Sequence, residues 1–135
     1  MNYPLYTLID FPSFVNKTGS LTVFDHKNIS FEIKRVFTIQ NIKKTDMRGG
    51  HTHHQTHQIL ICVVGQCVID MDNGTEKKTL ILNNPVQGIV LYPYVWHTMR
   101  NFKDGTILMV LASTDYNEKD YIRSYDEFLK IVKKI

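Results

Sequence analysis

The sequence predicts an all-β fold, a sandwich or barrel of short strands, that ends in one helix. Two observations predict the strands: apolar and polar residues alternate over most of the chain, and turn-forming pairs such as Asn73-Gly74 separate the alternating stretches at short intervals. A third observation predicts the helix, because the apolar residues that follow Ser124 recur at helical spacing.

The expected strands follow one another from the N-terminus. The first spans Tyr3 to Ile9, and the others are expected at residues 21–24, 31–39, 58–64, 68–71, 78–82, 88–92, 95–99 and 106–112. The segment 48–57 is also expected to be largely extended. Strands at this spacing, without an internal repeat or a linker, fit a small cupin-type jelly roll (a double-stranded β-helix) that forms a single domain over residues 1–135.

The C-terminal helix has recognisable ends. Ser124 followed by Glu127 fits a capping box, and Lys133-Lys134 suits the negative end of the helix dipole. The apolar stripe between these ends consists of Tyr125, Phe128, Leu129 and Val132. One helix is therefore expected at this end of the chain.

The composition argues against two classes of partner. The 135 residues are 43% hydrophobic and 21% charged, and the longest uncharged apolar runs are far shorter than the ~20 residues that span a bilayer. The net charge of +3 comes from scattered lysines, so neither a membrane nor a nucleic acid is expected as a partner. No secretion signal follows Met1, so the chain is expected to be cytoplasmic, with Cys62 and Cys67 as buried thiols.

The histidines indicate chemistry. Four of the six fall in the segment from His51 to His57, and imidazole is the side chain that most often ligates a metal or moves a proton near neutral pH. If the segment is extended, His51, His53 and His57 project to one face of the sheet, and His54 projects to the other. His97 lies on a later strand that a jelly roll can bring opposite them.

Two chemistries remain open from the residues alone. His51, His53, His57 and His97 stand roughly where a metal-dependent cupin enzyme places its ligands, although a carboxylate is usual at the third position. Alternatively, the imidazoles transfer protons without a metal.

A family resemblance runs through the segments 31–36, 48–53, 58–62, 95–99 and 110–113, and it is most distinctive in the tail at 116–128, which is similar to the pattern Y-x-E-x-D-Y-I-R-x-Y-D-x-F. In these segments the chain resembles the cupin-type 3,4-ketoisomerases that act on dTDP-4-keto-6-deoxyglucose. Tyr121, Arg123 and Tyr125 belong to this tail, and we expect them to pack the helix onto the barrel or onto a partner subunit.

The resemblance implies an isomerase that needs no metal or other cofactor. Its substrate would be a dTDP-linked 4-keto-6-deoxyhexose, its product a dTDP-3-keto-6-deoxyhexose for 3-amino-3,6-dideoxyhexose biosynthesis, and its catalytic residues His51 and His53. The residues expected to bind substrate are Arg35, Phe37, Arg48, Gln58, Trp96, His97 and Thr18, with core packing an equal alternative for Trp96. The family also implies a homodimer with an exchanged N-terminal strand.

Two positions depart from the family pattern. Phe37 stands where a tyrosine is usual and so lacks a hydroxyl for the proton relay, and Gly50 replaces an aromatic residue before His51. A sugar-nucleotide-binding cupin without catalysis is therefore a third hypothesis. His97 and Thr18 are expected near the sugar, and His97 slightly favours the galacto configuration at C4 of the product.

Overall fold

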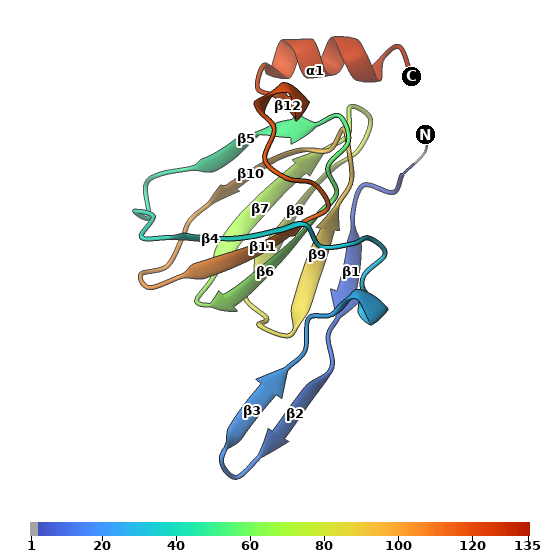
Figure 1. Cartoon of the computed structure of the whole chain (residues 1–135). Coiled ribbons are helices and arrows are strands. Elements are labelled where there is room, and N and C mark those ends of the chain that lie inside the picture. The colour runs from blue at the N-terminus through green and yellow to red at the C-terminus, as the bar shows by residue number, and fades with distance from the viewer. Residues whose placement is uncertain (1–2) are drawn as a thin grey trace.

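The computed structural model describes residues 3–135, which form two facing β-sheets, a separate hairpin and a C-terminal helix (Figure 1). One sheet has the order β1-β9-β6-β11-β4, with β1 (Thr7–Asp10), β9 (Gln87–Leu91), β6 (Gln58–Val64), β11 (Ile107–Ala112) and β4 (Arg35–Gln40). The other has the order β12-β5-β10-β7-β8, with β12 (Tyr121–Ile122), β5 (Arg48–His53), β10 (Trp96–Arg100), β7 (Cys67–Asp72) and β8 (Lys77–Leu82). The predicted all-β jelly roll with a short C-terminal helix is confirmed.

The core lies between the two sheets. Leu60 and Leu108 from the first sheet pack with Ile69 and Met99 from the second, and all four side chains are buried. The predicted alternation in β4 is also present, because Arg35 and Phe37 are half-buried while Val36 between them is exposed. Alternation therefore fixes which residues of each strand face the interior.

Two segments differ from the expectation. β4 begins at Arg35, because Arg35 pairs with Ala112, the last residue of β11, and the residues before it run past the end of that strand. β5 ends at His53, and the chain then turns, with the backbone N–H of His54 donating to the carbonyl of Asp120 (2.9 Å). The extended segment is thus shorter than predicted.

The N-terminal strand is short and lies in its own chain's sheet. β1 pairs antiparallel with β9, with Thr7 opposite Val90. The hairpin of β2 (Ser13–Asn16) and β3 (Gly19–Thr22) follows it and projects away from the two sheets (Figure 1). Exchange of an N-terminal segment with a second subunit stays a prediction.

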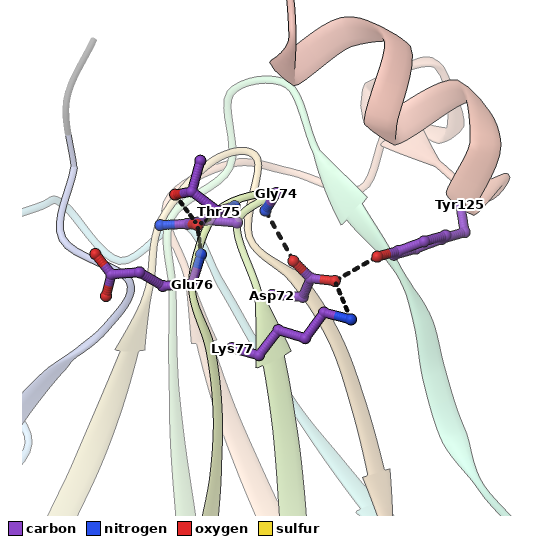
Figure 2. A network of polar contacts seen from close by, with 7 residues as sticks. Asp72, Gly74, Thr75, Glu76, Lys77 and Tyr125 are labelled. Atoms are coloured by element: carbon purple, nitrogen blue, oxygen red, sulfur yellow. Dashed lines mark hydrogen bonds and ion pairs between the residues drawn. The ribbon is translucent and has the colours of Figure 1, made fainter.

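The helix α1 (Tyr125–Val132) is fixed to the second sheet at two points. Its predicted cap is present, since the Ser124 hydroxyl accepts from the backbone N–H of Glu127. Phe128 is fully buried against Trp96 of β10, and the Tyr125 hydroxyl donates to the carboxylate of Asp72 (2.5 Å), as Figure 2 shows.

The 3₁₀ turns η1 (His26–Asn28) and η2 (Glu118–Asp120) complete the secondary structure. Cys62 and Cys67 are free and buried, as expected. None of the helices in residues 3–135 has the length and apolarity needed to cross a membrane.

Candidate active site

A cavity of about 310 Å³ lies between the two sheets, close to the histidine strand. Side chains of both sheets and of the tail after β11 line it. The lining residues relevant to binding and chemistry are Phe37, Arg48, His51, Gln58, His97, Tyr121 and Arg123. Of the residues expected from the sequence to act on or bind substrate, the cavity wall therefore contains His51, Phe37, Arg48, Gln58 and His97.

Three imidazoles cluster at this cavity: His51 and His97 line it, and the buried His53 lies beside them outside its lining. His51 lies edge-on to His53 and to His97, with ring centroids 5.2 and 4.9 Å apart, and the rings of His53 and His97 are 6.1 Å apart. His51 and His97 are directly opposite each other in the ladder between β5 and β10. The predicted approach of the later strand to the histidine strand is present.

Gly49 allows this close approach. Its φ of +85° is a conformation that L side chains rarely adopt, and a Cβ atom there would lie 2.8 Å from the carbonyl oxygen of His97. The ladder between β5 and β10 is also irregular at this point, between His97 and Thr98. Gly50 also has positive φ, but a Cβ atom there would meet open space.

All three imidazoles are neutral at neutral pH in this structure. The pKa of His51 is lowered to about 3 and that of His53 to about 2, mainly by burial and also by the charge that His97 would carry. Burial also lowers the pKa of His97 to about 4, against a weaker opposing effect of the hydrogen bond between its Nδ1 and the carbonyl of Val95. Neutral imidazoles can accept protons from a substrate.

Several buried polar atoms at the site have no hydrogen-bond partner among the described residues. They are Nδ1 of His51, Nε2 of His53 and Nε of Arg35. Oγ1 of Thr52 is also unpaired, but Thr52 lies between the two histidines on β5 and so points to the opposite side of the sheet. Buried polar groups are normally hydrogen-bonded, so unpaired ones beside a cavity indicate that a ligand supplies the missing contacts. A molecule with several oxygen atoms suits these donors and acceptors.

Three guanidinium groups surround the imidazoles. Arg48 and Arg123 line the cavity, and Arg35, half-buried, lies with its Cζ atom 5.3 Å from the centre of the Phe37 ring. Arg35 also contributes to the low pKa of His53, so its positive charge reaches the imidazole. An anionic ligand would offset this concentration of positive charge.

His57 does not join the other histidines. The expected shared face requires an extended strand as far as residue 57, but β5 ends at His53, and the His57 ring instead packs against Tyr3, Tyr92 and Phe31. His54 also lies apart, with its Nδ1 3.2 Å from the Tyr94 hydroxyl. In residues 3–135 there is no group of three or more His, Cys, Asp and Glu side chains arranged to hold a metal ion.

Two other expected binding residues lie away from the cavity. Trp96 precedes His97 in β10 and so points to the opposite side of the sheet, where it packs against Tyr125 and Phe128. Thr18 lies in the turn of the projecting hairpin, with its hydroxyl bonded to Asn16. Core packing, the alternative for Trp96, is what its contacts show.

The tail after β11 contributes more to the site than the sequence indicated. Tyr121 and Arg123, expected to be packing residues, both line the cavity, and Arg123 bonds through Nε and Nη2 to Glu118 (2.6 and 2.9 Å). The distinctive tail pattern was the available signal, but it does not say which of its residues turn inward.

Comparison with known proteins gives one family. Residues 5–133 match the family model described as FdtA: WxcM-like, C-terminal. The chain is 40% identical over 129 residues to the TDP-4-oxo-6-deoxy-alpha-D-glucose-3,4-oxoisomerase of Aneurinibacillus thermoaerophilus. The aligned residues make up 95% of this chain and 93% of that protein.

Solved structures agree with this match. A mutant of the 3,4-ketoisomerase QdtA from Thermoanaerobacterium thermosaccharolyticum, in complex with TDP-4-keto-6-deoxyglucose, is 41% identical, with a TM-score of 0.94 over 99% of this chain and 97% of that one. WlaRA, a TDP-fucose-3,4-ketoisomerase from Campylobacter jejuni, is 36% identical, with a TM-score of 0.91 over 96% of this chain and 97% of that one.

Proposed function

The chain belongs to the FdtA (WxcM-like, C-terminal) family, and on that premise we propose the reaction that its cavity performs. It is a TDP-sugar 3,4-ketoisomerase, and its substrate is TDP-4-keto-6-deoxyglucose, the sugar named for its relatives. The product is a TDP-3-keto-6-deoxyhexose, made for 3-amino-3,6-dideoxyhexose biosynthesis. The whole chain, residues 1–135, acts as one domain. The observation that carries the proposal is the pair of neighbouring imidazoles of His51 and His53, each neutral and each with an unpaired ring nitrogen, at the cavity that His51 lines.

The reaction moves protons but changes no oxidation state overall. The C4 ketone acidifies the hydrogen on C3, so a base can remove it to form an enediolate. The C4 oxygen then gains a proton, the C3 hydroxyl loses one, and C4 receives a proton from the enzyme. The atoms balance without a cofactor, and we propose that the enzyme uses neither a metal nor another cofactor.

His51 and His53 divide the proton transfers: either one works at carbon, and the other then helps to relay the proton between the C3 and C4 oxygens. Both are neutral, as a base must be, and the 5.2 Å between their ring centroids lets both reach adjacent atoms of one sugar. The imidazolium that forms after proton abstraction is disfavoured by burial, which favours return of the proton to C4.

Arg48 and Arg35 supply positive charge to the substrate. Arg48 precedes the histidines on β5 and lines the cavity, where it suits the diphosphate. Arg35 lies beside His53 and the Phe37 ring, where it stabilises the negative charge that develops on the enediolate oxygens. Phe37 and Gln58 complete the wall around the sugar.

His97 is proposed to influence the configuration at C4, with the galacto product slightly favoured. It is buried, lines the cavity and lies 4.9 Å from His51, so it limits the face of the sugar from which C4 can receive its proton. The coupling constants of the product after a trapping transamination report this configuration.

We propose a homodimer in which subunits exchange an N-terminal segment, and Thr18 reaches the sugar from the partner subunit. The hairpin supports this, because Phe14, Val15 and Leu21 are 63, 79 and 59% exposed and an apolar surface of this kind favours a protein partner. The buried thiols Cys62 and Cys67 suit the cytoplasmic location proposed from the sequence.

A proton NMR time course with TDP-4-keto-6-deoxyglucose in deuterated water tests the function. Formation of a 3-keto sugar with deuterium at C4 is expected. Binding of the sugar nucleotide without exchange would instead indicate a binding protein, and turnover that requires a stoichiometric metal, lost on chelation, would indicate a metal-dependent enzyme.

A further inference from the structure

Tyr121 occupies a central place among the residues proposed to move protons. It lies opposite His53 in the ladder between β12 and β5. Its ring centroid is 5.0 Å from that of His51 and 4.4 Å from that of His53, edge-on to both, and the residue lines the cavity. A single side chain from the tail therefore contacts both proposed catalytic imidazoles.

The cavity provides few other groups that can handle a proton on oxygen. Among the described residues that line it, Tyr121 is the one hydroxyl-bearing side chain, and none carries a carboxylate. Phe37, which also lines the cavity, has no hydroxyl. Within residues 3–135 the Tyr121 hydroxyl makes no hydrogen bond, whereas those of Tyr116 and Tyr125 are bonded to carboxylates.

The chemistry requires a group of this kind. While a histidine removes the hydrogen from C3, the C4 oxygen becomes negative and must gain a proton, and the C3 hydroxyl must later lose one. His51 and His53 are neutral because burial lowers the pKa of each, so neither holds a surplus proton when the substrate binds. A neutral hydroxyl on a ring that contacts both imidazoles can donate a proton first and accept one afterwards.

We propose that Tyr121 is a further catalytic residue, whose hydroxyl carries the proton from the C3 hydroxyl to the C4 oxygen. The inference rests on the proposed isomerase function and adds to it. The phenol gives its proton to the C4 oxygen as the enediolate forms and takes the C3 hydroxyl proton as the C3 ketone forms. The Tyr121 hydroxyl is thereby protonated again. In the same reaction a histidine takes the hydrogen from C3, and C4 receives a proton from the histidine.

The surroundings of Tyr121 support this role. The guanidinium of Arg123 lies 4.5 Å from the centre of its ring, and Glu118, which also accepts from Tyr116 (2.6 Å), holds that guanidinium by two hydrogen bonds. A fixed positive charge beside the phenol stabilises negative charge that develops on its oxygen during transfer. The ladder with β5 fixes the backbone of Tyr121 opposite His53.

Replacement of Tyr121 by phenylalanine tests the proposal, because it keeps the ring and removes only the hydroxyl. Tyr94→Phe is the matched control, since its hydroxyl contacts His54 outside the cavity. We would measure TDP affinity, loss of the C3 proton to solvent and formation of the 3-keto sugar. Fluorotyrosine at position 121 adds a readout of acidity, because fluorine makes the phenol more acidic with little change in shape.

We expect Tyr121→Phe to bind TDP within roughly 3-fold of the unmodified enzyme and to form product about 10²-fold or more slowly, the usual contribution of a general acid or base. Fluorotyrosine should move the alkaline limb of the kcat profile to lower pH, because the phenol must begin protonated. Product formation by Tyr121→Phe within roughly 3-fold of the unmodified enzyme, or an unmoved alkaline limb, would overturn the proposal. Failure of the unmodified enzyme to form product would instead overturn the function itself.

Discussion

His51 and His97 lie directly opposite each other on β5 and β10, with their ring centroids 4.9 Å apart. They come from parts of the sequence separated by four strands, and only the antiparallel ladder brings them together. His53, two residues along β5, adds a third imidazole to the same group. The site therefore depends on the register of this ladder as much as on the identity of its residues.

Replacement of His51 or His53 by asparagine should abolish isomerisation. Asparagine cannot accept the C3 proton, and it retains polar atoms for the cavity, so TDP affinity should stay within a few-fold. The NMR assay measures turnover, and calorimetry measures binding. His54→Asn is the matched control because His54 bonds to Tyr94 away from the cavity, and it should retain full turnover. Unchanged turnover in both test variants would remove the pair from the mechanism.

The low pKa values predict an unusual dependence of activity on pH. Because the free enzyme's His51 and His53 have pKa values of about 3 and about 2, both stay in the basic form through the mildly acidic range. The kcat/KM profile, which reports the free enzyme, should therefore stay flat down to about pH 5. An acidic limb near the ordinary imidazole value of about 6.5 would show that these histidines titrate normally.

Stability should fall in acid for the same reason. The buried imidazoles of His53 and His97 have lowered pKa values in the folded protein, so the unfolded chain binds protons first as the pH drops below about 6.5. Their contribution is complete above that pH and is lost progressively below it. Protonation of each of these two imidazoles in the unfolded chain should lower the free energy of unfolding by ~2 kcal/mol between pH 7 and pH 5. Urea denaturation at both pH values measures this loss, which should be smaller in His53→Asn.

Local sequence pattern predicted those features that depend on neighbouring residues. Turn-forming and cap-forming residues predicted the turn at Asn73-Gly74 and the cap at Ser124, and the structure has both. The two-residue alternation of a strand predicted that His51 and His53 share a face, and this is also present. The position of Trp96 could have been predicted too, because neighbours on one strand point to opposite sides and His97 was already expected to face the cavity.

Contacts between distant segments could not be predicted in this way. β5 ends at His53 because the tail binds the next residues, so the extended segment stops before His57. Tyr121 reaches the site because β12 pairs with that same strand, although most of the second half of the chain separates the two in sequence. The tail pattern was visible in the sequence, but its partner strand was not.

Gly49→Ala should damage the site more than Gly50→Ala. Both glycines have positive φ, which costs an alanine ~1 kcal/mol or more, but only at position 49 would the new methyl group meet the carbonyl oxygen of His97. We expect a larger loss of unfolding free energy and of turnover in Gly49→Ala, measured by denaturation and by the NMR assay. Equal losses in the two variants would show that the approach of β5 to β10 does not need this glycine.

Asp120 should fix the turn that follows the histidine strand. Its carboxylate accepts from the backbone N–H groups of Gln55 (2.8 Å) and Thr56 (3.2 Å) and from the Thr56 hydroxyl. Asp120→Asn keeps the shape but turns one acceptor into a donor that faces donors, so it should cost about 1–3 kcal/mol of stability. Hydrogen exchange should quicken at residues 54–57, and turnover should fall because His53 and Tyr121 adjoin the turn and its anchor.

The control for this change is Asp115→Asn, which removes the same charge from an exposed position in the same tail. If both variants lose the same stability, the effect comes from net charge and not from the hydrogen bonds to the turn. If Asp120→Asn loses stability while hydrogen exchange at 54–57 stays unchanged, Asp120 stabilises the tail alone. Faster exchange there together with slower turnover is the outcome expected if the tail positions the histidine strand through this carboxylate.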